Sequence, residues 1–199
     1  MVLGDRSAYA LCRPPGHHAG RASFGGYCYF NNAAAAAEFL CEGGQRVAIL
    51  DVDFHHGNGT QDLFYTRGDV LYVSIHGDPD HAYPYFSGRA TELGKSDGIG
   101  ANRNFPLPTG TSDPAYLECL KAACDEIARF EPAYLVLSLG LDTYVDDQLG
   151  DFLLTLGGYE GAATRVGALG IPTVVVQEGG YHLPSLGTSV ETWLSGLIG

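Results

Sequence analysis

Basic side chains are scarce in this 199-residue sequence. Lysine and arginine together number 11 against 23 aspartates and glutamates, which gives a formal net charge of −12. Such a chain repels phosphate groups, so the composition argues against a nucleic acid as partner and is more compatible with a cationic substrate. Solubility or a saline habitat would explain the same acidity, so the charge alone does not select the substrate.

A disulfide framework and a long apolar run are also lacking. The five cysteines are odd in number and include no C-x-x-C pair, which is typical of reduced thiols in a cytoplasmic protein. No stretch approaches about 18 apolar residues, and the charged Asp5 and Arg6 precede the first apolar run. The sequence therefore predicts a soluble, cytoplasmic chain with no signal peptide and no membrane partner. An oligomer is compatible with the sequence, which carries no signal that decides it.

Apolar runs alternate with helical patterns along the chain. Strands are predicted at 7–12, 47–50, 69–76, 133–139 and 172–177. Helices are predicted at 33–40, 60–65, 114–130 and 159–168. This alternation predicts a parallel α/β fold, and the length suits one domain. The Gly- and Pro-rich segment 77–111 is predicted to be a long functional loop with a short strand near 104–107.

The stretch 51–59 reads DVDFHHGNG and directly follows the apolar run 47–50. Alternate strand residues point to the same side, so Asp51, Asp53 and His55 are expected to share one face at the carboxyl end of a buried strand. Ligands of open parallel sheets gather at that edge. Two carboxylates and an imidazole suit a catalytic zinc or another divalent metal better than a closed structural zinc. The alternative is a strand end whose aspartates cap the next helix and whose histidines are solvated.

Polar residues also follow three other predicted strands. His17 and His18 come after a stiff Pro-Pro-Gly loop and are either general acid–base groups or ordinary surface residues. Asp142 follows the strand 133–139 and offers a third ligand for a metal. Tyr181 follows Glu178 and two glycines, which permit a tight turn that brings the tyrosine over the sheet edge.

Five motifs in this order resemble the histone deacetylase superfamily: RPPGHHA at 13–19, GGYCYFNN at 25–32, DVDFHHGNG at 51–59, LGLDT at 139–143 and EGGY at 178–181. The resemblance spans nearly the whole chain and is greatest to the bacterial acetylpolyamine amidohydrolase branch. It implies a three-layer αβα arginase-deacetylase fold around a mainly parallel sheet. It also implies zinc-dependent hydrolysis of an N-acetyl amide, with residues 1–199 forming a single, partial catalytic domain.

The same resemblance implies two metal sites. The zinc ligands it implies are Asp53, His55 and Asp142, with open coordination for water and the substrate carbonyl. A structural potassium ion is implied at Asp51, Ser74 and the carbonyl of Ile75, shared with Asp53 and His55. Two carboxylates and one imidazole also suit iron or cobalt, and zinc is the expected metal.

Catalytic and substrate-binding roles follow from the resemblance as well. His18 matches the general base and acid, and His17 its electrostatic partner, hydrogen-bonded to Asp51. Asn58 would orient His18; some family members carry Asp there. Tyr181 matches the tyrosine that polarises the scissile carbonyl. The substrate-binding matches are Gly26 as backbone acceptor for the substrate amide, and Tyr27 and Tyr83 as aromatic walls of an acyl-lysine-like channel.

The sequence departs from the family at its start and at one rim position. Family members have strands, helices and rim loops before the His-His motif, whereas Met1 lies only 16 residues before His17. The sheet is therefore expected to be N-terminally truncated and to lack the family's first strands, and loops that shape polyamine selectivity and dimerisation would be missing. The usual Asp-Pro after the third ligand motif reads Asp147-Gln148 here, a smaller change in the channel rim.

Three functions are compatible with these residues. The first is a zinc amidohydrolase that removes acetyl or other short acyl groups from acetylated amines, such as acetylpolyamines or acetyl-lysine. The second is a small-acyl esterase using the same zinc site, and the third an inactive remnant that only binds metal or acyl ligands. The first is preferred because an amide needs a Lewis acid, an activated water and an oxyanion donor, and each role has a candidate. A binuclear arginase-like site is disfavoured, since the sequence offers no second set of bridging carboxylates.

Overall fold

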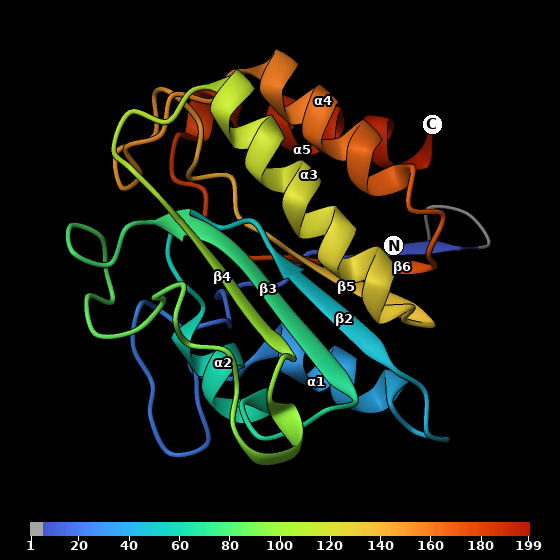
Figure 1. Cartoon of the computed structure of the whole chain (residues 1–199). Helices are drawn as coiled ribbons and strands as arrows, with labels where there is room; N and C mark the ends of the chain where they lie inside the picture. The colour runs from blue at the N-terminus through green and yellow to red at the C-terminus, as the bar shows by residue number, and fades with distance from the viewer. Residues whose placement is uncertain (1–5) are drawn as a thin grey trace.

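The computed structural model describes residues 6–199, and within that part six strands form one sheet (Figure 1). All neighbouring strands are parallel, in the order β1-β6-β5-β2-β3-β4. The strands are β1 Ser7–Ala10, β2 Val47–Asp51, β3 Val70–Gly77, β4 Asn102–Leu107, β5 Tyr134–Leu139 and β6 Thr173–Gln177. The predicted parallel α/β fold is confirmed.

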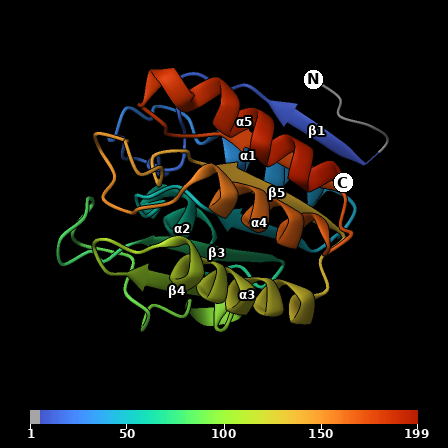
Figure 2. The ribbon, with the colours of Figure 1, turned by 90° about the horizontal axis from the view of Figure 1, so that it is seen from above.

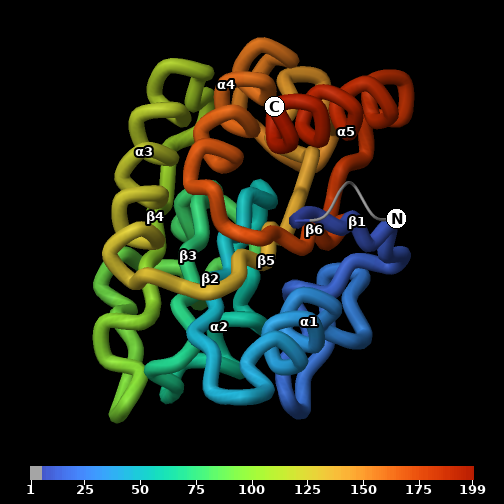
Figure 3. Tube along the Cα trace, turned by 90° about the vertical axis from the view of Figure 1, so that its right-hand side faces the viewer, coloured from blue at the N-terminus to red at the C-terminus, as the bar shows by residue number. Residues whose placement is uncertain are grey.

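Helices cover both faces of this sheet and make it the middle of three layers (Figure 3). One face carries α1 (Asn32–Leu40) and α2 (Asn58–Phe64). The other carries α3 (Asp113–Phe130), α4 (Leu156–Gly167) and α5 (Leu183–Ile198), which lie side by side when seen from above (Figure 2). In residues 6–199 no helix combines the length and the apolar character needed to cross a bilayer.

The strands form where apolar residues can be buried on both sides. In β2, Val47 and Ile49 belong to the apolar cluster on the α1/α2 face, while Ala48 and Leu50 belong to the larger cluster on the other face. All four are fully buried. Because both faces are covered, the strand reads as a continuous apolar run rather than an alternating one. The carboxylate of Asp51 is the first charge along this strand.

The predicted elements are present with shifted ends. Helices α2 and α4 begin two to three residues before their predicted starts, and β4 begins at Asn102 instead of Asn104. The segment 77–111 also contains a short 3-10 helix, Ser96–Gly98. Helix α5 had no counterpart among the predicted helices. Asn31 caps α1, since its side chain accepts the N–H of Ala34.

The order of strands places a topological switch point between β2 and β5. The chain leaves β2 through α2 toward β3 on one side, and leaves β5 through α4 toward β6 on the other. Because α2 and α4 lie on opposite faces, the connections diverge where β2 and β5 end (Figure 1). Such a switch point at the carboxyl ends of parallel strands is where open α/β sheets bind ligands.

Candidate metal centre and catalytic site

Asp53, His55 and Asp142 meet at this switch point, beyond the carboxyl ends of β2 and β5. One potential ligand atom from each lies within 4.8 Å of the others. The Nδ1 atom of His55 is 2.9 Å from Asp142 Oδ2 and 3.3 Å from Asp53 Oδ1. Both carboxylates are buried, while the His55 side chain remains partly exposed. The three side chains are therefore close enough to contact one ion, and the cluster is open to solvent on the His55 side.

Backbone groups hold the two carboxylates in place. The N–H of Gly179 donates to Asp53 Oδ2 at 2.8 Å, and the N–H of Phe54 donates to Asp142 Oδ1 at 2.8 Å. A Cβ atom at Gly179 would lie 2.7 Å from Asp53 Oδ2 and 2.9 Å from Asp142 Oδ2, and one at Gly140 would lie 2.3 Å from Asp53 Oδ2. These two glycines after β5 and β6 thus leave the space that the carboxylates occupy.

The electrostatics of this cluster favour a cation. Burial and the neighbouring Asp53 carboxylate raise the pKa of Asp142. Burial lowers the pKa of His55, but its hydrogen bonds to Asp142 and Asp53 outweigh burial and raise that pKa to about 11. Two buried carboxylates side by side therefore require positive charge between them. Together with a donor set of two carboxylates and one imidazole, this fits the zinc ion that the family resemblance implies.

Asp51 lies apart from the Asp53, His55 and Asp142 cluster. Strand β2 ends at Asp51, so the alternation expected for residues 51, 53 and 55 does not continue beyond it. The Asp51 carboxylate accepts hydrogen bonds from His17 Nδ1 and the Tyr72 hydroxyl, both at 3.0 Å. Asp51 is also the register partner of Ser74 on β3. Asp51, the last residue of β2, thus pairs with His17, whereas Asp53 and His55 beyond it belong to the cluster.

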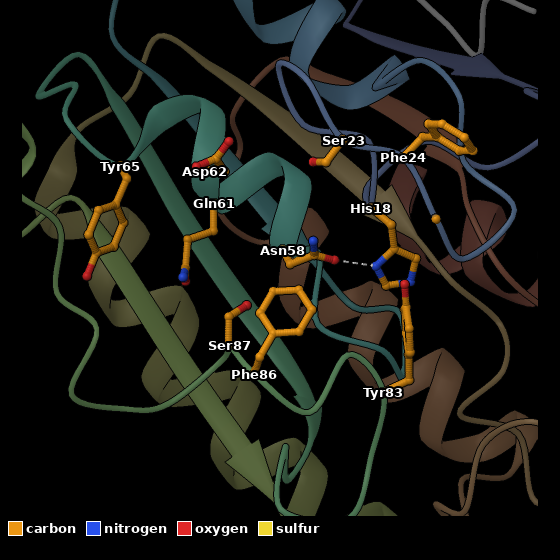
Figure 4. A pocket seen from close by; sticks show the side chains of 11 residues that line it. His18, Ser23, Phe24, Asn58, Gln61, Asp62, Tyr65, Tyr83, Phe86 and Ser87 are labelled. Atoms are coloured by element: carbon orange, nitrogen blue, oxygen red, sulfur yellow. Dashed lines mark hydrogen bonds between the residues drawn. The ribbon is translucent and has the colours of Figure 1, made fainter.

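The adjacent histidines His17 and His18 have opposite electrostatic environments. Burial lowers the pKa of His17, but Asp51 and Asp53 outweigh it and raise the pKa to about 10. Burial and the positive charge of His17 lower the pKa of His18 to about 3. The His18 Nδ1–H donates to Asn58 Oδ1 at 2.8 Å, as Figure 4 shows, so its Nε2 carries the free lone pair. The pair therefore combines an imidazolium with a neutral imidazole.

Aromatic residues surround these histidines. Tyr181 follows β6, its ring centroid lies 6.0 Å from that of Tyr27, and burial together with Asp53 and Asp142 raises the pKa of its hydroxyl. Tyr83 packs edge-on against His18, with 4.9 Å between the ring centroids, and its centroid lies 6.3 Å from that of His55. The backbone of Gly26 lies against His18, since a Cβ atom there would be 2.1 Å from the ring. The described structure thus brings the predicted catalytic and substrate-binding residues close to the cluster of Asp53, His55 and Asp142.

Sequence comparison agrees with this geometry. The Histone deacetylase domain family matches residues 1–197 of the chain. The chain belongs to the histone deacetylase domain family. The resemblance inferred from the five motifs is therefore confirmed.

Two acetylpolyamine amidohydrolases resemble this chain over its whole length. Acetylpolyamine amidohydrolase 1 of Pseudomonas aeruginosa is 51% identical over 200 residues, and the acetylpolyamine amidohydrolase of Mycoplana ramosa is 49% identical. The chain spans 58% and 59% of the length of these relatives. A crystal structure of the acetylpolyamine aminohydrolase from Burkholderia pseudomallei matches with a TM-score of 0.95 and 50% identity, covering 98% of this chain and 57% of that chain.

Sequence reasoning assigned no role to Glu178, a buried residue of this deacetylase-family chain. Its carboxylate accepts the N–H groups of Gly16 at 2.6 Å and His17 at 3.1 Å, and the Ser138 hydroxyl at 2.8 Å. Burial raises the pKa of Glu178 to about 7. Glu178 also forms a second group of potential ligand atoms with His17 and Cys28, within 4.8 Å of one another. The sequence feature that could have identified Glu178 is its position directly after β6, at the sheet edge where Asp53 and Asp142 also lie.

A pocket of about 460 Å³ lies beside His18 in the deacetylase-family site (Figure 4). It opens between α2 and the loops around Phe24 and Phe86. Its lining consists of His18, Ser23, Phe24, Gly25, Asn58, Gln61, Asp62, Tyr65, Tyr83, Phe86 and Ser87. These residues include one carboxylate and no lysine or arginine. His18 and Tyr83 also lie near the cluster of Asp53, His55 and Asp142, since their ring centroids are 6.2 Å and 6.3 Å from that of His55.

Proposed function

We propose that the chain is the catalytic part of a zinc-dependent amidohydrolase that removes acetyl or other short acyl groups from acetylated amines. The observation that carries the proposal is the meeting of Asp53, His55 and Asp142 beside a neutral His18. An amide is a poor electrophile, so its hydrolysis needs a Lewis acid, a base for the attacking water and a donor for the oxyanion. The site offers a candidate for each.

The three clustered side chains would hold zinc. When bound, zinc supplies Lewis-acid chemistry, which polarises a carbonyl group and makes a water molecule more acidic. Potassium would be held by Asp51, Ser74 and the Ile75 carbonyl, shared with Asp53 and His55. The β2–β3 register, which places Asp51 opposite Ser74, and the complete burial of the Asp51 carboxylate support this second site.

His18 would carry the proton during the reaction. Because its Nδ1–H is engaged by Asn58, its Nε2 is free to take a proton from the attacking water. The low pKa keeps His18 neutral at physiological pH, and the protonated ring can then give its proton to the leaving amine. His17, positively charged and paired with Asp51, would favour the negative charge that develops on the attacked carbonyl group.

Tyr181 would stabilise the oxyanion. Its raised pKa keeps the hydroxyl protonated, so the hydroxyl can donate a hydrogen bond to the carbonyl oxygen as that atom gains charge. The Gly26 carbonyl would accept the N–H of the scissile amide. Tyr27 and Tyr83 would form the aromatic walls that contact the chain of the acylated amine.

Acetylated polyamines are the favoured substrate class. The bacterial relatives at about half identity are named acetylpolyamine amidohydrolases, and the net charge of −12 favours a substrate with free ammonium groups. The pocket beside His18, with Asp62 and four aromatic rings, is compatible with such a cation. Cytoplasmic location stays a prediction, supported by the five free cysteines.

Turnover of matched acyl substrates tests this proposal. Purified protein of measured metal content would be assayed with an N-acetylated diamine and with an aryl acetate, each with and without a chelator. We expect chelator-sensitive amide hydrolysis that zinc restores. Ester hydrolysis without amide hydrolysis would favour an esterase, and full metal occupancy without turnover of either substrate would favour a remnant that only binds.

A further inference from the structure

Asp147 ties the loop that follows Asp142 to the turn that carries Tyr181. One of its carboxylate oxygens, Oδ2, accepts the backbone N–H of Tyr181 at 2.7 Å and that of His182 at 2.9 Å. The other oxygen, Oδ1, accepts the N–H of Leu149 at 2.9 Å. Asp147 is buried, with 9% of its surface exposed, so these N–H groups replace the water that a carboxylate would otherwise bind.

The turn between β6 and α5 has one anchor on each side of Gly180. On the β6 side, Gly179 donates its N–H to Asp53, and its carbonyl accepts the N–H of Leu141. Gly180 then has φ of +131°, a backbone conformation that few other residues adopt. Beyond Gly180, the two N–H groups bound by Asp147 fix the backbone of Tyr181 and His182. Asp147 therefore sets the direction in which the tyrosine side chain leaves the turn.

We propose that Asp147 is a positioning residue for Tyr181: it holds the tyrosine hydroxyl at the carbonyl oxygen of the substrate without contacting the substrate itself. This inference rests on the proposed function, since it assigns Asp147 to the same reaction. The geometric demand is strict, because displacement of a reacting group by about 1 Å can reduce turnover about a hundredfold. Asp147 also joins the loop of a metal ligand to the turn of the oxyanion donor, which keeps the two groups in register.

If Asp147 only stabilised the fold, its removal would lower turnover by the same factor whether or not Tyr181 keeps its hydroxyl. Asp147→Ala removes both acceptor oxygens, whereas Asp147→Asn keeps one oxygen for the Tyr181 and His182 N–H groups. The neighbouring Asp146 is exposed, so Asp146→Ala is a control at the next position in the same loop. Tyr181→Phe removes the hydroxyl that Asp147 is proposed to position. The decisive comparison is between Asp147→Ala in the parental protein and the same change in the Tyr181→Phe protein.

The kinetic experiment is a double-mutant cycle on turnover of an N-acetylated diamine, with zinc content and thermal unfolding measured for each variant. We expect Asp147→Ala to lower turnover about a hundredfold, Asp147→Asn to lower it less, and Asp146→Ala to leave it unchanged. In the Tyr181→Phe background, Asp147→Ala should cause no further loss, because the group it positions is absent. Losses that multiply in the double variant would overturn the proposal, as would full turnover in Asp147→Ala.

Hydrogen exchange gives a readout that does not need activity. In Asp147→Ala, the backbone amides of Tyr181 and His182 should exchange roughly tenfold faster than in the parental protein, since both lose a hydrogen bond to a charged acceptor. Amides of residues 173–177 should not change. Unchanged exchange at Tyr181 and His182 would contradict the positioning role. If the parental protein hydrolyses no acyl amide, the proposed function fails, and the exchange result still decides whether Asp147 holds the turn.

Discussion

The middle and the carboxyl end of β2 are equally buried but consist of opposite kinds of residue. Ile49 and Leu50 are 0% exposed and lie in apolar clusters, whereas Asp51 is 0% and Asp53 1% exposed. A buried carboxylate without partners is unfavourable by several kcal/mol, so the end of the strand depends on its bonds to backbone N–H groups and histidines and on the proposed cation. The middle of β2 therefore stabilises the fold, while its end places charged groups at the proposed metal site.

Removing the Asp142 carboxylate should abolish metal binding without unfolding the protein. We expect Asp142→Ala to lose zinc and activity together, because two ligands from one strand end cannot hold a catalytic zinc without the third. The variant should stay folded, since it also removes a repulsion between buried carboxylates. Elemental analysis and circular dichroism on the same sample provide the test. Full zinc occupancy in Asp142→Ala would mean that the third ligand is another residue.

His18→Ala should separate proton transfer from metal binding. Turnover should fall by about a hundredfold to ten-thousandfold, which is the range for loss of a general base. Zinc content should remain at the parental level, since His18 lies outside the Asp53, His55 and Asp142 cluster. Steady-state kinetics and elemental analysis check both statements. A parallel fall in zinc and turnover would make His18 a ligand instead.

Shortening an apolar side chain in the middle of β2 should lower stability but leave zinc binding and turnover unchanged. Ile49→Ala leaves a cavity in the cluster on the α1/α2 face and should lower the free energy of unfolding by about 2–5 kcal/mol. The folded variant should keep its zinc and its turnover at low temperature. Denaturant titration together with activity assays measures the two effects. A loss of zinc from folded Ile49→Ala would show that the two parts of the strand are not separable.

Asn58→Asp should produce the smallest change, confined to the pH profile. A carboxylate beside His18 Nδ1 favours the protonated ring and raises its pKa from the low value set by burial and His17. The base must be neutral to act, so a higher pKa means that activity is lost earlier as the pH falls. The acidic limb of the pH profile should therefore move to higher pH by about one unit. The pH dependence of kcat/KM provides the measurement. An acidic limb that stays in place or moves to lower pH would contradict the role of Asn58.

Local sequence patterns were sufficient for most of the elements and for the strand ends that carry the site. The apolar runs of β2, β3, β5 and β6 have both faces covered, so their composition alone indicates buried parallel strands. The residues that follow such strands must meet at one edge of the sheet, which is why Asp53 and Asp142 could be placed together. Strand order could not be predicted, because it depends on pairings between residues far apart in the chain.

Helix α5 and the role of Asp147 show what local patterns miss. Ser189, Trp193 and Leu197 are buried at a spacing of four residues, but glycines and small polar residues weaken the helical signal. Tertiary packing explains Gly196, since a Cβ atom there would lie 2.8 Å from the Cβ of Ala163 on α4. Asp147 reads as a surface loop residue until the fold brings the Tyr181 turn against it. Both features depend on contacts between elements, which no single segment contains.

Zinc titration of chelator-treated protein tests the central claim most directly, namely that one ion at Asp53, His55 and Asp142 enables amide hydrolysis. Turnover of an N-acetylated diamine would be followed as zinc is added, with Asp142→Ala as control. The account predicts that turnover rises in proportion to added zinc and saturates at one ion per chain, and that the control does not respond. Turnover that survives complete removal of metal, or that requires two ions per chain, would contradict it.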